Sequence, residues 1–436
     1  MQTAPKKVIT AWTMYDWANS VYNLVVTSTV FPAYYESMTG DGNPLTSDRI
    51  RFLGLNFDNV ALYNYALSFA FLIVAILSPL LSSIADVKGN KKSFLRFFMT
   101  MGSLACSALF FFNKDNLWLG LSCSIVACIG FWSSLVFYNS YLPEIAAPED
   151  RDKISARGFS MGYIGSVILQ LISFVLILKS DLFGINQGRA SQISFLLVGI
   201  WWFGFGQWPL RVLPNPEHAG SLNGDHWITK GYRELGNVWS ILKKMPVLKS
   251  FLSAYFFYNM GLQTVMLAAS LYAASELGIP TPKLMISILL IQLIAIPGAV
   301  VISRLSGKIG NIPAIMFCVA FWIGLCYMGY SAPTGNVNYF YVLASLVGFA
   351  MGGTQALSRS TYAKLMPVTR DTTSFFSFFD VSEKIGIVIG LFLFGFLTEV
   401  TGSQRISVLS CMVFFIIGLM LLFITRKRIS HETVRD

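Results

Sequence analysis

The chain has 436 residues, of which 54% are hydrophobic and only 12% charged, and its mean hydropathy is +0.60. Average soluble domains carry about 25% charged residues, so this composition excludes soluble globular and disordered proteins and indicates an integral membrane protein. The net charge of +10 comes from basic residues that gather in alternate loops. That pattern is a topology signal, so we expect a lipid bilayer and no nucleic acid as partner.

Runs of about 20 apolar residues, long enough for a helix to cross a bilayer, recur along the chain. Each must satisfy its own backbone hydrogen bonds in lipid, so runs of this length predict helices and not barrel strands. Twelve spans are expected at residues 11–34, 61–85, 93–112, 117–142, 157–178, 191–212, 248–275, 284–304, 312–332, 338–359, 374–398 and 405–425. The expected fold class is all-α and polytopic.

The orientation of the chain in the membrane follows from the basic residues of its loops. Assigning alternate loops to one side places 24 Lys and Arg residues there and 7 on the other, with Lys384 inside a span completing the 32. The positive-inside rule then puts both termini in the cytoplasm, as an even number of spans requires. The N-terminal run lacks a short apolar stretch with a small-residue cleavage site, so no cleaved signal peptide is expected.

The longest basic connection, between spans six and seven, predicts a linker at residues 214–247 between two halves, 1–213 and 248–436. Two internal matches support this division. Ser82–Asn90 resembles Ser303–Asn311 at an offset of 221, and Pro148–Arg151 resembles Pro367–Arg370 at an offset of 219. Parallel six-helix repeats of this kind are typical of the major facilitator fold.

Charged residues inside spans cost about 2.5 to 3.5 kcal/mol each on insertion scales, so they mark candidate functional sites. Four occur here: Asp16 in span one, and Asp380, Glu383 and Lys384 in span eleven. The i, i+4 spacing of Asp380 and Lys384 predicts a local ion pair. That leaves Asp16 and Glu383 for proton binding or gating; the alternative is a structural network at the inner gate without proton chemistry.

Neutral polar residues also recur within the spans at helical spacing. They predict a mid-membrane substrate site formed by Asn19, Asn23, Asn259, Gln263 and Gln355. Hydrogen bonds between helices are the alternative role for each of them. Arg157 and Arg359, at helix ends, are expected to snorkel or to pair in loops.

Glycine pairs at i, i+4 spacing predict close helix packing in three spans, at Gly158 and Gly162, Gly348 and Gly352, and Gly386 and Gly390. All six cysteines fall in apolar runs without metal-ligand spacing, and His218, His226 and His431 lie outside the spans. We therefore expect no disulfide, no metal site, no histidine relay and no cofactor.

The loop after span two, Asp86–Lys92, resembles the signature loop of the major facilitator superfamily, with Asp86, Gly89 and Lys91 at its defining positions. In that superfamily the loop holds the inner face closed through contacts with span eleven. The second copy has Gly307 where the first has the aspartate. The Gly-Pro step of the antiporter signature is not met, because Tyr163 follows Gly162.

A narrower resemblance involves Trp12–Ser20, Phe31–Tyr34, Tyr141–Glu144 and the Ser155–Gly165 run. These motifs are similar to the vacuole-effluxer-like branch of the superfamily. The yeast members of that branch release amino acids from the vacuole.

The expected function is transport by alternating access of a small neutral or zwitterionic solute, with amino acids implied by the resemblance. Proton coupling through Asp16 or Glu383 is left open, as are symport and facilitated diffusion. We expect a monomer without enzymatic activity, in a bacterial inner membrane. The alternative is a transporter-like sensor or scaffold that binds a solute without moving it.

Overall fold

Long helices occupy the twelve expected positions in the computed structural model, which describes residues 2–40, 49–52, 54–215 and 227–433. The first runs through Lys6–Val21 (α1), a π-helical segment Tyr22–Val30 and Phe31–Thr39 (α2). The others are Asn59–Lys88 (α3), Lys91–Ala108 (α4), Leu117–Asn139 (α5), Arg151–Leu178 (α7), Gln187–Val212 (α8), Pro246–Ser275 (α10), Thr281–Ile309 (α11), Asn311–Tyr330 (α12), Val337–Leu365 (α13), Thr372–Thr401 (α14) and Gln404–Thr433 (α15).

Ten of the described helices are long and apolar enough to cross a membrane. The other two long helices are the first one and α10, whose polar residues, such as Asn19 and Asn259, lower their hydropathy. The all-α polytopic prediction is confirmed apart from one short antiparallel hairpin, in which Arg49–Phe52 (β1) pairs with Leu55–Asp58 (β2). Most helices extend several residues beyond the expected spans.

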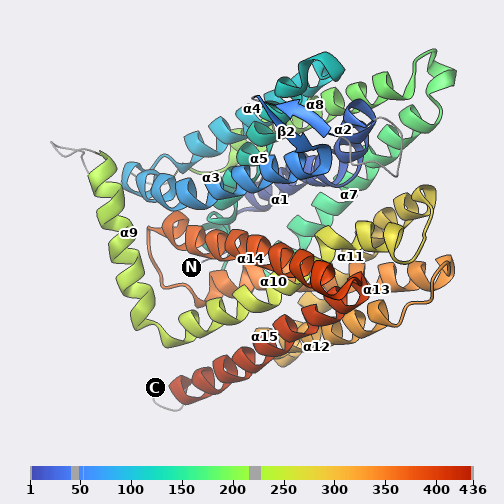
Figure 1. Ribbon diagram of the computed structural model, residues 1–436. Coiled ribbons are helices and arrows are strands. Elements are labelled where there is room, and N and C mark those ends of the chain that lie inside the picture. The colour runs from blue at the N-terminus through green and yellow to red at the C-terminus, as the bar shows by residue number, and fades with distance from the viewer. Residues whose placement is uncertain (1, 41–48, 53, 216–226, 434–436) are drawn as a thin grey trace.

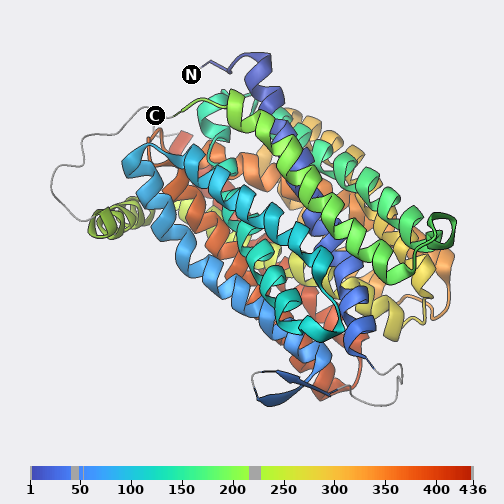
Figure 2. The ribbon, with the colours of Figure 1, turned by 90° about the horizontal axis from the view of Figure 1, so that it is seen from above.

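Two groups of helices lie side by side, α1 to α8 above and α10 to α15 below in Figure 1. Across the boundary, α7 packs against α11 and α13, and α3 packs against α14. Both described chain ends lie at one end of the bundle, which we call the terminal end, and the hairpin lies at the other (Figures 1 and 2). The short helix Leu142–Ile145 (α6) also lies at the terminal end, where the carbonyl of Ile145 accepts from the backbone N–H of Ala4 at 2.8 Å.

The linker contains a helix, Trp227–Lys244 (α9). It lies across the terminal end of the bundle (Figure 1) and packs against α3. Its apolar side is buried at Val238 and Leu242, and Trp239 stacks on Phe378 of α14 with ring centroids 5.5 Å apart. Residues 216–226 of the linker, with His218 and His226, lie outside the described residues.

The first membrane helix departs from the regular α-helix that periodicity predicts. Residues Tyr22–Val30 form π-helical turns, in which hydroxyls bond carbonyls five residues back: Ser28 donates to Asn23 and Thr29 to Leu24, each at 2.8 Å. A π segment carries more residues per turn than an α-helix, so it changes which face each side chain occupies. This places Asn23 at an exposed position between buried neighbours.

Candidate functional site

A buried ion pair joins the two halves near the terminal end. Nη1 of Arg359 on α13 lies 3.2 Å from Oδ2 of Asp16 on α1, and the two residues are only 3% and 4% exposed. The hydroxyl of Tyr138 donates to the same carboxylate oxygen at 2.7 Å. Arg359 also donates to the carbonyl of Ser155 at 2.9 Å and to Oδ1 of Asn139 at 3.2 Å. Four helices thus meet around one ion pair.

The expectation that Arg359 would snorkel or pair in a loop is wrong. Helix α13 continues to Leu365, so Arg359 lies within the helix and not at its end. Its guanidinium carbon sits 4.1 Å from the ring centroid of Phe159 and 4.8 Å from that of Trp12, a favourable place for a buried cation. Gly158 provides the space, because a Cβ there would lie 2.5 Å from Asp16 Oδ2 and 2.9 Å from Arg359 Nη2.

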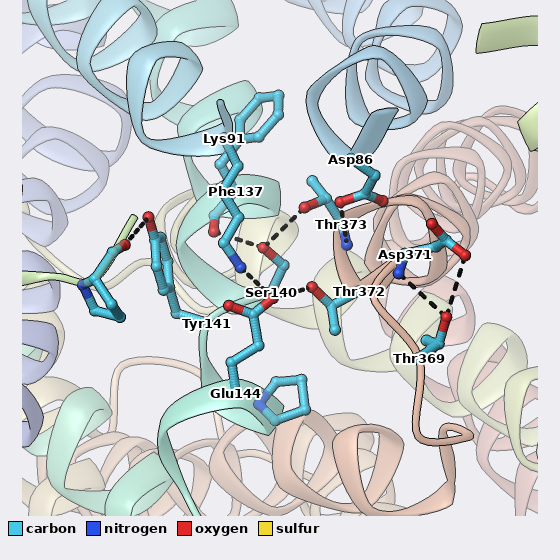
Figure 3. A network of polar contacts seen from close by, with 12 residues as sticks. Asp86, Lys91, Phe137, Ser140, Tyr141, Glu144, Thr369, Asp371, Thr372 and Thr373 are labelled. Atoms are coloured by element: carbon cyan, nitrogen blue, oxygen red, sulfur yellow. Dashed lines mark hydrogen bonds and ion pairs between the residues drawn. The ribbon is translucent and has the colours of Figure 1, made fainter. Parts of the chain in front are cut away.

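Asp86 of the signature loop binds the N-terminus of α14 in the other half (Figure 3). Its carboxylate accepts from the backbone N–H of Ser374 at 2.7 Å and of Thr373 at 3.3 Å, and from the Ser374 hydroxyl at 2.7 Å. A carboxylate at this place satisfies free N–H groups and opposes the positive end of the helix dipole. Gly89, at φ 62°, lets the chain turn from α3 into α4.

Lys91 extends this contact (Figure 3). Its ammonium lies 2.5 Å from Oε1 of Glu144 and 4.0 Å from the ring centroid of Tyr141. The same Glu144 oxygen accepts from the hydroxyl of Thr372 in the other half at 2.6 Å. All three predicted signature-loop residues therefore take part in, or shape, one connection between the halves.

Asp152 at the start of α7 makes a second such connection. It accepts from Ser306 Oγ and Asn311 Nδ2, each at 2.8 Å, and from Lys364 Nζ at 2.6 Å. Ser306 and Asn311 belong to the second copy of the signature loop, where Gly307 replaces the aspartate. The acidic group is thus supplied by the helix that the loop contacts, and the loop supplies the donors.

Within the described part of the chain, no hydrogen bond links any two of the five amide residues predicted as the substrate site. Gln355 accepts from the hydroxyl of Tyr163 at 2.8 Å, which joins the halves about 15 Å from the end of α13. Gln263 donates to Glu383 at 2.5 Å. The buried Nδ2 groups of Asn19 and Asn259 have no partner among the described residues.

The charged residues of α14 form a compact group. Nζ of Lys384 lies 2.6 Å from Asp380 Oδ1, as the i, i+4 spacing predicts, and 3.4 Å from Glu383 Oε2. The same ammonium lies 3.6 Å from the ring centroid of Trp132 in the other half, and Asp380 accepts from Ser78 at 3.2 Å. Asp16 and Glu383, which the sequence left for proton binding or gating, therefore both contact a basic side chain.

The predicted glycine faces are close-packing sites at Gly348, Gly352 and Gly390, where a Cβ would overlap the neighbouring helix, whereas Gly386 has room for one. No group of three His, Cys, Asp or Glu side chains within the described ranges could hold a metal ion. The six cysteines are unpaired.

Comparison with known proteins identifies the family of this chain. The family described as "Vacuole effluxer Atg22 like" matches residues 4–433. The chain belongs to this family. The uncharacterized MFS-type transporter YxiO of Bacillus subtilis (strain 168) is 31% identical over 425 residues, covering 97% of this chain and 95% of its own. Autophagy-related protein 22 of Saccharomyces cerevisiae (strain ATCC 204508 / S288c) is 28% identical over 411 residues, covering 83% and 76%.

Solved structures give the fold of this Atg22-like chain. The human organic anion transporter MFSD10 superposes with a TM-score of 0.72 at 12% identity, covering 96% of this chain and 99% of that one. The fucose:proton symporter FucP of E. coli gives 0.69 at 13%, covering 96% and 97%. Family and fold together make the chain a multi-pass membrane transporter of the major facilitator type.

Sequence reasoning did not single out Arg359, Glu144 or Asp152 as members of this site. A signal existed for Arg359: it lies one turn after Gln355, on the side of span ten that Gly348 and Gly352 also mark, so it continues a polar and small-residue stripe. No comparable signal marked Asp152, because its partners come from three other helices.

Proposed function

We propose that this chain is a secondary transporter, not an enzyme, that moves a small zwitterionic solute by alternating access, with amino acids as the substrate class. The observation that carries the proposal is the set of hydrogen bonds and ion pairs between the halves, gathered from the terminal end to mid-membrane. The halves 1–213 and 248–436 are the two moving bodies. Asn19, Asn23, Asn259, Gln263 and Gln355 line the solute site between them.

In this proposal the contacts of Asp86, Glu144, Asp152 and Asp16 act as a gate that closes the terminal end. Charge asymmetry in the loops supports placing that end in the cytoplasm. The proposal also has the protein act as a monomer in a bacterial inner membrane. The exposed Asn23 supports access to the site from the opposite side. Opening toward the cytoplasm requires all of these contacts to break together.

Proton coupling is proposed at Asp16. A proton on its carboxyl group would remove the negative charge that holds Arg359, and the buried arginine would then lose its counter-ion across the halves. Such a change weakens the gate selectively, because Asp86 and Asp152 make separate contacts. Coupling therefore links one proton to one opening of the terminal end.

Uptake of a radiolabelled amino-acid mixture into proteoliposomes, with and without an imposed pH gradient, tests the function. Gradient-driven accumulation above empty liposomes is the expected result. Flux that merely equilibrates the solute would show facilitated diffusion and exclude proton coupling. Absence of flux with protein that elutes as a single folded species would reject amino acids as substrates.

A further inference from the structure

The charged group on α14 contains two carboxylates and one ammonium, so its described members leave one negative charge uncompensated. Asp380 is closest to Lys384, at 2.6 Å, and receives a further hydrogen bond from Ser78. Glu383 is held more loosely, at 3.4 Å. The ion pair of Asp16 and Arg359 is neutral by itself and offers no spare positive charge. An uncompensated charge within a membrane is costly, so a positive partner is expected at Glu383.

Glu383 is also the most accessible member of the group. Its side chain is 16% exposed, against 8% for Asp380 and 1% for Lys384. One oxygen accepts from Gln263 at 2.5 Å, which fixes the carboxylate's orientation. The other oxygen has only the long contact to Lys384 and retains acceptor capacity. Glu383 can therefore accept hydrogen bonds from a molecule that enters the site.

A donor group lies on the neighbouring helix. Asn259 precedes Gln263 by one turn on α10, and Tyr255, one turn earlier, stacks on Phe379 of α14 at 4.0 Å. Asn259 therefore lies on the side of α10 that faces the charged group. It is 4% exposed, and its Nδ2 has no partner among the described residues. A buried unsatisfied donor one helical turn before Gln263, which contacts an accessible carboxylate, suits a ligand that carries both an acceptor and a positive donor.

We propose that Glu383 binds the ammonium group of the transported solute, and that Asn259 donates to the solute's carboxylate. An ammonium brings three N–H donors and the missing positive charge, and charge-assisted hydrogen bonds of this kind are among the stronger ones. This inference rests on the proposed transport of zwitterions and assigns a residue to its charge recognition. It takes Glu383 out of proton coupling, which stays with Asp16.

The test uses the full chain in proteoliposomes, with uptake of a radiolabelled amino-acid mixture. Unlabelled competitors are amino acids, their amides, which keep the ammonium, and the matching desamino acids, which keep only the carboxylate. Amino acids and amides should compete, and desamino acids should not. Glu383→Gln should raise the concentration needed for half-maximal uptake by about tenfold or more, and Glu383→Asp should raise it less.

Glu399→Gln is the matched control, since this exposed glutamate lies on the same helix; it should leave uptake unchanged. Competition by desamino acids equal to that of the amines, or normal affinity in Glu383→Gln, would overturn the assignment while transport itself stands. Normal affinity with lost pH dependence would make Glu383 a proton site instead. No uptake by the unmodified protein would reject the proposed function and this inference with it. Elution as a single species checks that each variant is folded.

Discussion

Asp16 and Arg359 are 343 residues apart in sequence, yet they form a buried ion pair between the two halves, with Nη1 3.2 Å from Oδ2. Water solvates neither charge, since both residues are almost fully buried. Removing one partner of such a pair leaves a bare buried charge, whereas removing both does not. The pair therefore contributes to stability and, in the proposed mechanism, to closure of the gate, and single and double substitutions can separate these two contributions.

Arg359→Gln should lower the free energy of unfolding by about 3 kcal/mol or more, because Asp16 would be left buried without its counter-ion. Adding Asp16→Asn to Arg359→Gln should restore most of the lost stability. Thermal unfolding in detergent measures both. Arg157→Gln, which changes an exposed arginine on α7, is the control and should have little effect. If the losses of stability in the two single variants simply add in the double variant, the two residues do not interact.

Asp16→Asn alone should abolish solute accumulation or separate it from the pH gradient, while the protein still inserts and folds. An amide can accept from Tyr138, but it can neither take up a proton nor supply the negative charge that pairs with Arg359. Uptake into proteoliposomes, with and without the gradient, measures this. Asp181→Asn, in an exposed turn, should behave as the unmodified protein. Unchanged transport and unchanged pH dependence in Asp16→Asn would remove Asp16 from the mechanism.

Gly158→Ala should disrupt the same ion pair without changing any charge. Its Cβ would come within 2.5 Å of Asp16 Oδ2 and 2.9 Å of Arg359 Nη2, so the pair must separate or α7 must shift. We expect transport to fall several-fold and thermal stability to drop. Gly204→Ala on α8 is the control, since nothing lies within 4 Å of its added methyl group. Similar behaviour of the two variants would mean that the gate tolerates the displacement.

The number, order and approximate bounds of the helices could be predicted because each membrane helix is encoded by its own apolar run. The ion pair of Asp380 and Lys384 could be predicted as well, because both residues lie on one helix at i, i+4 spacing. The hairpin at Arg49–Asp58 and the π-helical turns of Tyr22–Val30 have no comparable signal. Both depend on backbone geometry that periodicity does not specify.

The gate could be predicted only in part, because its contacts cross between halves. Asp86 was found through its resemblance to a known loop. The second copy looked degenerate, since Gly307 carries no charge, yet Asp152 of the opposite helix supplies the carboxylate there. In the first copy the loop supplies the acceptor, whereas in the second copy the loop supplies the donors and the facing helix supplies the acceptor. A single sequence does not reveal such an exchange, because it requires knowing which helix faces the loop.

Gln263→Ala should raise the solute concentration for half-maximal uptake more than it lowers expression. Gln263 donates to Glu383 at 2.5 Å, so its loss frees the carboxylate to change orientation without creating a buried charge. Initial rates over a range of solute concentrations measure the effect. Gln207→Ala on α8 is the control, because Gln207 donates to the carbonyl of Phe203 in its own helix. Lost expression with normal affinity would make Gln263 a packing residue.

Asp86→Ala and Asp152→Ala should each shift the protein toward the state in which the terminal end is open. Each substitution removes the carboxylate that accepts hydrogen bonds in one connection between the halves, and the alanine side chain has no acceptor to replace it. Asn23 is exposed in this structure, so Asn23→Cys should react with a membrane-impermeant maleimide from the side opposite the termini.

Either gate substitution should slow that reaction several-fold, and the double variant should slow it further, because the two connections close the same end through different helices. Five of the six native cysteines are buried and the sixth is partly exposed, so a protein without Asn23→Cys gives the background. Asp181→Asn, away from the gate, should leave the rate unchanged. Faster labelling in Asp86→Ala would show that its bond to the N-terminus of α14 opposes opening on the other side.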